Sequence, residues 1–342
     1  MKVKSIVCRE INEDIGSVKL EEIDLPAPGS HEVRIRLKAC AVNFPDLLMI
    51  QGKYQFKPDL PFSPGGEASG DIEACGNAIT KFKEGDPVVV SMRYGGFSEA
   101  VVVSENDVRT KPKGMNYAQA ASYQTAYLTA YVALYRRGDL RAGEVLLVHG
   151  ATGGVGMAAV DLGKYFGAQV IATGGTDIKL DVVKQRGADA VINYSQPDGT
   201  LGGFREEVKS LTGGLGADVI YDPVGGDVFD ESMRCINWGG RILTIGFTSG
   251  RWPLAPVNLI LIKQIAVIGV RAGEYGRQDP IRGKENTDEI YRLAEEGLIS
   301  PYVSHAFPIE KTVDAMRLLE NREVIGKAVV TMNGYELDKG RV

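Results

Sequence analysis

The residues with the clearest chemical pattern lie in a glycine-rich turn between residues 145 and 156. The apolar run Val145–Val148 has the pattern of a strand, and Val155–Phe166 that of a helix. Small residues between them let the backbone approach a phosphate closely, and the start of the helix directs free N–H groups at it. This order predicts a dinucleotide site that holds the pyrophosphate. The expected contacts are Ala151, in the place of the first glycine, and Thr152, Gly153, Gly154, Val155 and Gly156.

The tip of the next strand, Gln169–Ala172, indicates which dinucleotide is bound. A site for NAD usually has an acid there, which accepts from the ribose 2′-OH. Here Thr173–Thr176 contains no acid, and Asp177 is expected to cap the following helix. A neutral tip with cations nearby suits a 2′-phosphate, so we expect NADPH. The nearest cation is Lys179, and the alternative is that its side chain is simply solvated on the surface of the helix. The expected contacts are Gly174, Lys179, Tyr194 and Arg322.

Alternating strands and helices must position these residues. The pattern predicts a long buried helix over Tyr117–Tyr135 and then a parallel, doubly wound sheet. The expected strands are 145–148, 169–172, 190–192, 218–221, 241–245 and 265–268, with helices at 155–166 and 178–186. The tail adds helices at 288–296 and 311–320 and a strand at 328–330. Residues 1 to about 125 have mostly strand patterns, with one short helix near 46–51.

Composition excludes several classes of partner. The formal net charge is −5, so neither nucleic acid nor an anionic membrane is expected. The apolar run Leu259–Ile262 is interrupted by Lys263 and is too short to cross a bilayer. The four cysteines are scattered, which is typical of a reducing compartment. We therefore expect a cytoplasmic protein.

Several segments outside the glycine-rich turn carry a family resemblance. They are Val42–Asp46, Gln51–Tyr54, Pro61–Glu67, Asn193–Gln196, Asp222–Gly226, Gly239–Arg241 and Gly326–Lys327. Together they resemble the medium-chain dehydrogenase/reductase superfamily, in its zinc-independent quinone oxidoreductase (zeta-crystallin-like) branch. The resemblance implies an α/β fold: a Rossmann doubly wound parallel sheet plus a mostly β, GroES-like catalytic domain. The expected limits are 1–125 for the first part of the catalytic domain, 126–268 for the nucleotide-binding domain and 269–342 for the return to the catalytic domain.

Departures from the zinc-dependent members indicate a reaction without metal. Those members place a cysteine where Asn43 stands, a histidine where Gly66 stands and a second cysteine near Thr125. A catalytic zinc needs three protein ligands of the Cys, His or carboxylate type, and these positions do not supply them. The histidines of the chain do not replace them. Glu67 alone is no zinc site, and we expect it to be structural.

The same resemblance implies the reactive groups. It places Asn43 and Tyr54 beside the nicotinamide and the substrate, and Tyr54 is the better candidate for polarising the substrate or supplying a proton. Two alternatives stay open: Asn43 satisfies backbone groups in the turn beside Pro45, and Tyr54 is a packed aromatic of a lid. The resemblance also implies cofactor contacts from Asn43, Thr129, Gly246, Phe247, Val270 and Ala272.

These observations predict an NADPH-dependent reductase of quinones or of activated (enone or enoyl) double bonds, and the motifs do not separate these substrates. The alternative is an NADPH-binding structural or regulatory protein with little turnover. A short-chain dehydrogenase would need Tyr-x-x-x-Lys in its core, and that spacing occurs only as Tyr335 with Lys339 in the polar tail. The expected partners are a small-molecule substrate and a second copy of the chain, because the family often dimerises through the last sheet strand, here Ile265–Val270.

Overall fold

The structure, a computed structural model, describes residues 1–198 and 200–337. The chain forms two compact units: Met1–Gln124 groups with the part of the chain from Leu293 onward, and Thr125–Arg292 forms the second unit. The segment 269–292, which the sequence assigned to the catalytic domain, therefore groups with the second unit. Lys339, noted above for its spacing from Tyr335, lies outside the described residues.

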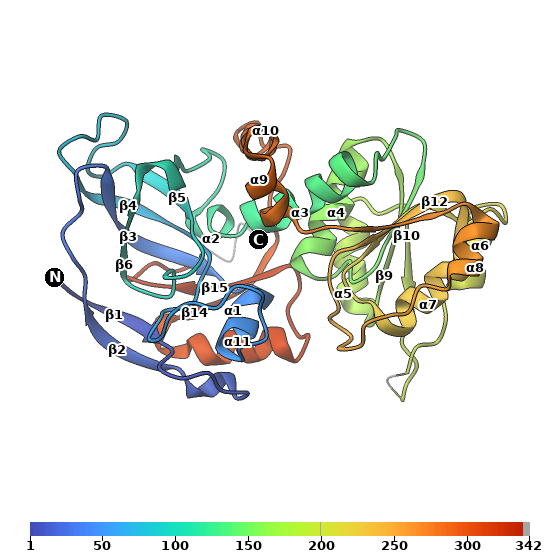
Figure 1. Cartoon of the computed structure of the whole chain (residues 1–342), viewed down its shortest axis with the longest axis horizontal. Coiled ribbons are helices and arrows are strands. Elements are labelled where there is room, and N and C mark those ends of the chain that lie inside the picture. The colour runs from blue at the N-terminus through green and yellow to red at the C-terminus, as the bar shows by residue number, and fades with distance from the viewer. Residues whose placement is uncertain (199, 338–342) are drawn as a thin grey trace. The chain divides into compact units, whose positions relative to one another are not determined.

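The first unit is built on a mostly antiparallel sheet whose strands follow the order β14-β15-β3-β4-β5-β7, with β6 paired to β3 and a separate hairpin of β1 and β2 (Figure 1). Its strands are β1 (Lys2–Val7), β2 (Lys19–Asp24), β3 (Glu32–Ala41), β4 (Glu67–Cys75), β5 (Pro87–Ser91), β6 (Ala100–Ser104), β7 (Val108–Thr110), β14 (Val303–Pro308) and β15 (Lys327–Thr331). Three short helices accompany them: α1 (Phe44–Ile50), α2 (Tyr117–Ala120) and α11 (Thr312–Glu320). The GroES-like expectation for this unit is confirmed.

Strand β3 is central because its side chains alternate between core and surface. Val33, Ile35 and Leu37 are fully buried, whereas the residues between them are more exposed. The end of β3 is apolar on both faces and pairs with β15, which joins residues about 290 positions apart in the chain. This pairing positions Lys327, at the start of β15, for the site described below.

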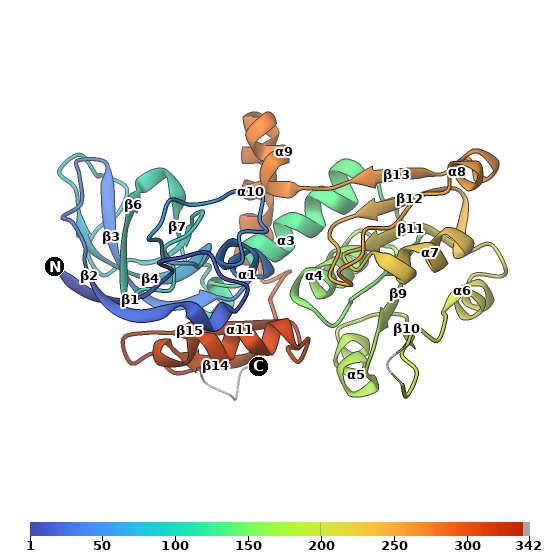
Figure 2. The same cartoon turned by 60° about the horizontal axis from the view of Figure 1, so that its bottom comes forward.

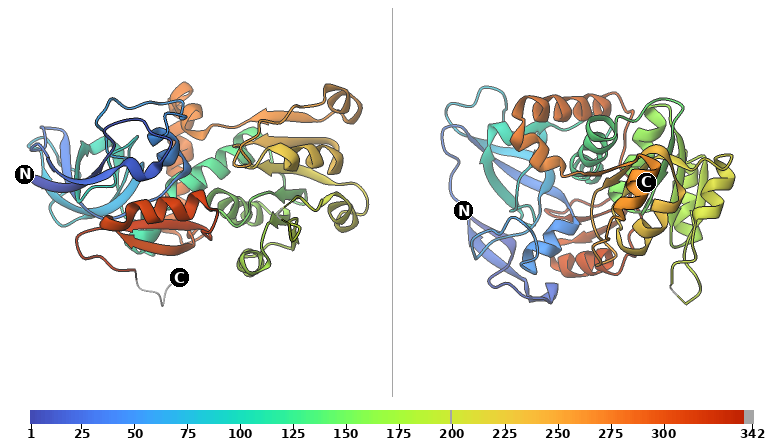
Figure 3. Two further views of the ribbon diagram at one scale, coloured as in Figure 1. Left: turned by 90° about the horizontal axis from the view of Figure 1, so that it is seen from below. Right: turned by 45° about the vertical axis from the view of Figure 1, so that its right-hand side comes forward.

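The second unit is a parallel sheet with the strand order β10-β9-β8-β11-β12-β13 (Figure 2). Its strands are β8 (Val145–Val148), β9 (Gln169–Gly174), β10 (Ala190–Asn193), β11 (Ala217–Asp222), β12 (Ile236–Thr244) and β13 (Ala266–Gly269). Its helices are α3 (Gln124–Tyr131), α4 (Gly154–Tyr165), α5 (Asp177–Gln185), α6 (Arg205–Leu211), α7 (Gly226–Cys235), α8 (Val257–Lys263), α9 (Ala272–Gln278) and α10 (Pro280–Glu295). Helices cover both faces of this sheet (Figure 3), which confirms the doubly wound Rossmann architecture.

The long helix expected over Tyr117–Tyr135 is wrong, because the segment is broken. After α2, the hydroxyl of Ser122 donates to the Ala118 carbonyl oxygen at 2.7 Å, and the Ser122 amide turns to the Gln119 carbonyl. A serine that bonds the backbone in this way competes with the helix ladder. Helix α3 then begins at Gln124 and continues as a π-helical segment over Val132–Arg137.

Four further helices and one extension were missed in the sequence. Helices α6, α7, α8 and α9 were not predicted, although α7 buries one full face against the sheet. Helix α10 begins at Pro280, eight residues before the expected start at Asp288. Proline at a first helical position has the backbone angle a helix needs, so it is a start signal there. Within residues 1–198 and 200–337, no helix is long and apolar enough to cross a membrane.

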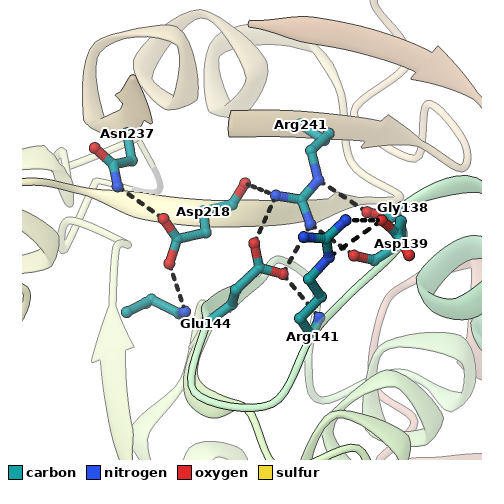
Figure 4. Close-up of polar contacts among 8 residues, drawn as sticks. Gly138, Asp139, Arg141, Glu144, Asp218, Asn237 and Arg241 are labelled. Carbon is teal, nitrogen blue, oxygen red and sulfur yellow. Dashed lines mark hydrogen bonds and ion pairs between the residues drawn. The ribbon is translucent and has the colours of Figure 1, made fainter. Parts of the chain in front are cut away.

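An arginine fastens the edge of the second sheet where its strands begin (Figure 4). The Arg241 guanidinium donates to both carboxylate oxygens of Glu144 at 2.8 Å, and to the carbonyls of Gly138 and Asp139 at 2.8 and 3.0 Å. Burial raises the pKa of Glu144, but Arg241 outweighs it, so the pKa of this carboxyl is lowered. These contacts tie the loop before β8 to β12.

Candidate functional site

The glycine-rich turn directs backbone amides at the carboxyl edge of the second sheet. Gly150 follows β8 with a φ of +55°, a left-handed conformation that suits glycine. A Cβ on Gly156 would lie 2.2 Å from the Gly150 carbonyl oxygen, so only glycine lets helix α4 pack this closely. Gly153 caps α4, and the first amides of a helix have no acceptor one turn back. The sequence placed the first glycine function at Ala151, whereas Gly150 makes the turn.

A buried histidine joins the two strand ends beside this turn. His149 is fully buried; its Nδ1 lies 2.8 Å from the Thr173 hydroxyl and its Nε2 lies 2.8 Å from the Ser232 hydroxyl. Because Ser232 donates to the Val228 carbonyl, it accepts from the ring, which places the proton of the neutral imidazole on Nε2. Burial lowers the pKa of His149 to about 3. The ring therefore stays neutral and holds β8, β9 and α7 together.

The tip of β9 has the acid-free form that the sequence shows. The cap of α5 is Thr176, one position before the expected Asp177, which is instead the first residue of the helix. The Asp177 Oδ1 accepts from the Asn193 Nδ2 at 2.8 Å. The Tyr194 amide donates to the Gly174 carbonyl at 3.0 Å, so these two predicted contacts lie together. Lys179 is partly buried in α5 of the same unit. Arg322 belongs to the other unit, in the turn after α11, with a φ of +60°.

The ends of β11, β12 and β13 complete the same edge. Thr248, directly after the predicted contacts Gly246 and Phe247, donates from its amide to the Pro223 carbonyl at 3.1 Å. This ties the β12 end to the turn that follows β11. Val270 and Ala272 follow β13 and are buried. After β8 the chain continues to β9 on one side of the sheet, whereas after β11 it continues to β12 on the other side. Ligands of such sheets bind at this switch point between β8 and β11.

Asp222 ends β11 at this switch point. Its Oδ1 accepts from the amides of Val224 and Gly225 at 2.8 and 2.9 Å. Its Oδ2 is buried and, within the described part of the chain, has no hydrogen-bond partner. Burial raises the pKa of this carboxyl to about 6.

In the first unit, Asn43 belongs to a buried polar triad with Glu67 and Lys327. The Lys327 Nζ donates to the Asn43 Oδ1 at 2.6 Å and to the Glu67 Oε1 at 3.0 Å, and the Asn43 Nδ2 donates to the same Glu67 oxygen at 3.0 Å. Glu67 and Lys327 are almost fully buried, whereas Asn43 is partly exposed. Sequence reasoning missed Lys327; its pair Gly326–Lys327 stood only among the resembling segments.

A neighbouring carboxyl fixes the backbone of this triad. The Asp46 side chain accepts from the Asn43 amide at 2.8 Å and from the Gly65 amide at 3.1 Å. Burial raises the pKa of Asp46 to about 7. The backbone groups of the turn beside Pro45 are therefore satisfied by the Asp46 side chain, a role that the sequence analysis had considered for Asn43.

The other two predicted side chains occupy simpler surroundings. Tyr54 follows α1 and packs its ring, partly buried, against the core of the first unit. Thr129 lies in α3, and its hydroxyl donates to the Thr125 carbonyl at 2.7 Å, which leaves the oxygen able to accept.

The residues around Glu67 do not fit a catalytic zinc ion. Among the described residues, no group of three His, Cys, Asp or Glu side chains is placed to hold a metal. The Glu67 carboxylate already binds an ammonium, and Gly66 offers no side chain. Cys40 is buried nearby, and burial raises the pKa of its thiol well above the usual range, which disfavours the thiolate that a metal needs.

Comparisons with solved structures agree with this geometry. A structure described as an NAD-dependent alcohol dehydrogenase superposes with a TM-score of 0.86 and 32% identity, over 96% of this chain and 100% of that chain. A mycobacterial protein, Rv1454c, complexed with NADPH superposes with a TM-score of 0.84 and 27% identity, over 96% and 99% of the two chains.

Sequence families and curated relatives narrow the class. Residues 29–113 match the alcohol dehydrogenase GroES-like domain and residues 154–283 the zinc-binding dehydrogenase family. The chain belongs to the medium-chain dehydrogenase/reductase superfamily of oxidoreductases. Its similar relatives are quinone oxidoreductase-like protein 2 homolog of Nematostella vectensis, 35% identical over 96% of this chain and 88% of the relative, and quinone oxidoreductase-like protein 2 of Mus musculus, 34% identical over 96% and 92%. The predicted quinone oxidoreductase resemblance is confirmed.

Proposed function

We propose that the chain is an NADPH-dependent reductase of quinones or of activated carbon–carbon double bonds, and that it works without metal. The observation that carries the proposal is the glycine corner of Gly150 and Gly153–Gly156 at the switch point of the sheet, beside a β9 tip without an acid. When bound there, NADPH would supply a hydride from C4 of its nicotinamide.

The preference for NADPH over NADH rests on charge at the β9 tip. No carboxylate stands at Thr173–Thr176, and Asp177 is bound by Asn193. A ribose 2′-OH therefore lacks its usual acceptor, whereas a 2′-phosphate would gain from Lys179 and Tyr194. The backbone amides at Gly153–Gly156 serve the pyrophosphate of either nucleotide, so the corner alone does not discriminate.

The reaction needs donors for the acceptor's oxygen. When a carbonyl-activated double bond or a quinone accepts a hydride, negative charge develops on oxygen, and without a metal this charge must be met by hydrogen bonds. We assign this task to the side chains of Asn43 and Tyr54, because the amide N–H of one and the hydroxyl of the other can donate hydrogen bonds. One proton then completes the two-electron reduction, and the Tyr54 hydroxyl is our candidate for supplying it.

The test separates the enzyme from a binding protein. NADPH is titrated against the chelator-treated protein by nucleotide fluorescence, and NADPH oxidation is then measured with a series of quinones and enones. Binding followed by turnover supports the proposal. Tight binding with no acceptor that oxidises NADPH would favour the structural or regulatory alternative. Absence of binding by either pyridine nucleotide, or turnover restored only by a divalent ion, would refute it.

We also propose that the protein pairs with a second copy of itself through the edge of the second sheet. Strand β13 pairs only with β12 among the described strands, so its other edge carries unpaired amides and carbonyls. Beside it, Leu254, Val257 and Leu261 are 85%, 77% and 78% exposed, an apolar surface that a partner would cover. Leu261→Asp should lower the mass measured by light scattering from dimer to monomer. Leu215→Asp, at an exposed leucine after α6, should leave it unchanged.

A further inference from the structure

The triad of Asn43, Glu67 and Lys327 joins three distant parts of the first unit. Asn43 precedes α1, Glu67 begins β4 and Lys327 begins β15. Its three hydrogen bonds measure 2.6, 3.0 and 3.0 Å. The two charged members are almost fully buried, and only Asn43 is partly exposed. The buried ion pair is thus linked to the surface through one amide.

The chemistry of the two ions dictates how that amide is turned. An ammonium only donates hydrogen bonds, so the Asn43 group that faces Lys327 must be the carbonyl oxygen. A carboxylate only accepts, so the group that faces Glu67 must be the amide nitrogen. A flipped amide would oppose donor to donor and acceptor to acceptor in a buried place, which is costly. The orientation therefore follows from the partners.

The same contacts leave one amide hydrogen of Asn43 uncommitted. Its oxygen is used by Lys327, and one Nδ2 hydrogen is used by Glu67. Within the described residues, the second Nδ2 hydrogen has no acceptor in the protein. Asp46 fixes the main chain from the other side by accepting from the Asn43 amide. Asn43 is thus held with one further N–H available to donate.

We propose that Lys327 and Glu67 are positioning residues that turn the Asn43 amide so that its free N–H meets the carbonyl oxygen of the substrate. The inference rests on the proposed reduction of a quinone or enone, in which that oxygen gains negative charge. Buried ion pairs contribute little net stability because desolvation offsets their attraction, and in some proteins they are retained for the arrangement that they specify. A donor fixed before the substrate arrives needs no reorganisation when charge develops.

Kinetics with a double-mutant cycle test this role. Asn43→Ala should lower kcat by roughly 10- to 100-fold, as for the loss of one preorganised donor. Lys327→Met, read together with the charge-neutral pair Lys327→Met/Glu67→Gln in case a lone buried carboxylate unfolds the protein, should lower kcat by a similar factor without changing NADPH affinity. In the Asn43→Ala background the Lys327 change should add nothing to kcat. Losses that multiply would overturn the inference, because Lys327 would then act without Asn43.

A second measurement does not depend on turnover. Protein labelled with ¹⁵N in its asparagine side chains shows the two Asn43 amide hydrogens as separate signals, identified by their loss in Asn43→Ala. In the wild type the hydrogen that faces Glu67 should exchange slowly with solvent; in the neutral pair variant it should exchange at least tenfold faster. The exposed-loop variant Lys83→Met serves as the control. An unchanged Asn43 signal in the pair variant would sink the positioning role, whereas a wild type without any turnover would sink the proposed function alone.

Discussion

The carboxyl group of Asp222 makes the stability of the second unit depend on pH in a predictable direction. Its Oδ1 accepts from two amides, its Oδ2 is buried without a described partner, and burial raises its pKa from 3.8 to about 6. The folded protein therefore binds this proton more tightly than the unfolded chain does. The resulting stabilisation is fully present below pH 3.8 and is lost as the pH rises through about 6.

The size of the effect follows from the shift. A difference of about two pKa units corresponds to about 3 kcal/mol of unfolding free energy across this range. Asp222→Asn keeps an acceptor for the amides of Val224 and Gly225 but has no charge to bury. The unfolding free energy of the wild type, relative to this variant, should therefore fall by about 3 kcal/mol between about pH 3 and pH 7.

Urea unfolding followed by circular dichroism at several pH values measures this difference. Asp189→Asn is a control of opposite sign: burial raises the pKa of Asp189, but hydrogen bonds from Lys164 and the Val170 amide outweigh it, so its pKa is lowered. Relative to that variant the wild type should gain stability as the pH rises through 3.8. Parallel pH curves for the wild type and Asp222→Asn would refute the reasoning, since they would mean that the carboxyl is not buried as a charge.

Four further predictions concern binding, turnover and folding. Lys179→Ala should weaken NADPH by roughly tenfold to 100-fold in a fluorescence titration and leave NADH almost unchanged, because one charge-assisted hydrogen bond is lost; equal losses would exclude that contact. Tyr54→Phe should lower kcat by about 100-fold with unchanged NADPH affinity if its hydroxyl acts as an acid, and unchanged turnover would make it a packing residue. His149→Ala should cost roughly 2–4 kcal/mol of unfolding free energy, and this cost should shrink below pH 6.5, because the buried ring with its lowered pKa must stay neutral; a cost independent of pH would contradict that. Arg241→Met should lower the unfolding temperature while kcat/KM of the folded fraction stays the same; a changed kcat/KM would place it in the reaction.

Local signals predicted the fold well because each depends on neighbouring residues. The alternation in β3, the apolar strands of the second sheet and the glycines before α4 all require only a few adjacent side chains. The break at Ser122 escaped because a serine hydroxyl that bonds its own helix is indistinguishable in sequence from one that faces solvent.

The polar clusters escaped prediction for a different reason. Lys327 meets Asn43 across 284 positions of the chain, and His149 meets Ser232 across 83. No local pattern specifies such a pairing, because it depends on which strands lie side by side. For His149 a usable signal existed, a polar residue at the end of an apolar strand, whereas for Lys327 the sequence offered only a charged residue before a buried strand.

The contacts of Arg241 indicate which property of the protein a mutation beside it would change. Beside the arginine is a hollow of about 310 Å³ lined by Arg137, Arg141 and acidic groups, which resembles an anion site. The N–H groups of the Arg241 guanidinium, however, already donate to Glu144 and to backbone carbonyls (Figure 4). Few of them remain to bind an anion. The edge where the strands begin, at Arg241, and the carboxyl edge, at the glycine-rich turn, thus tolerate mutation differently. We expect changes at the Arg241 edge to reduce how many molecules fold, and changes at the glycine edge to alter, in addition, what each folded molecule can bind.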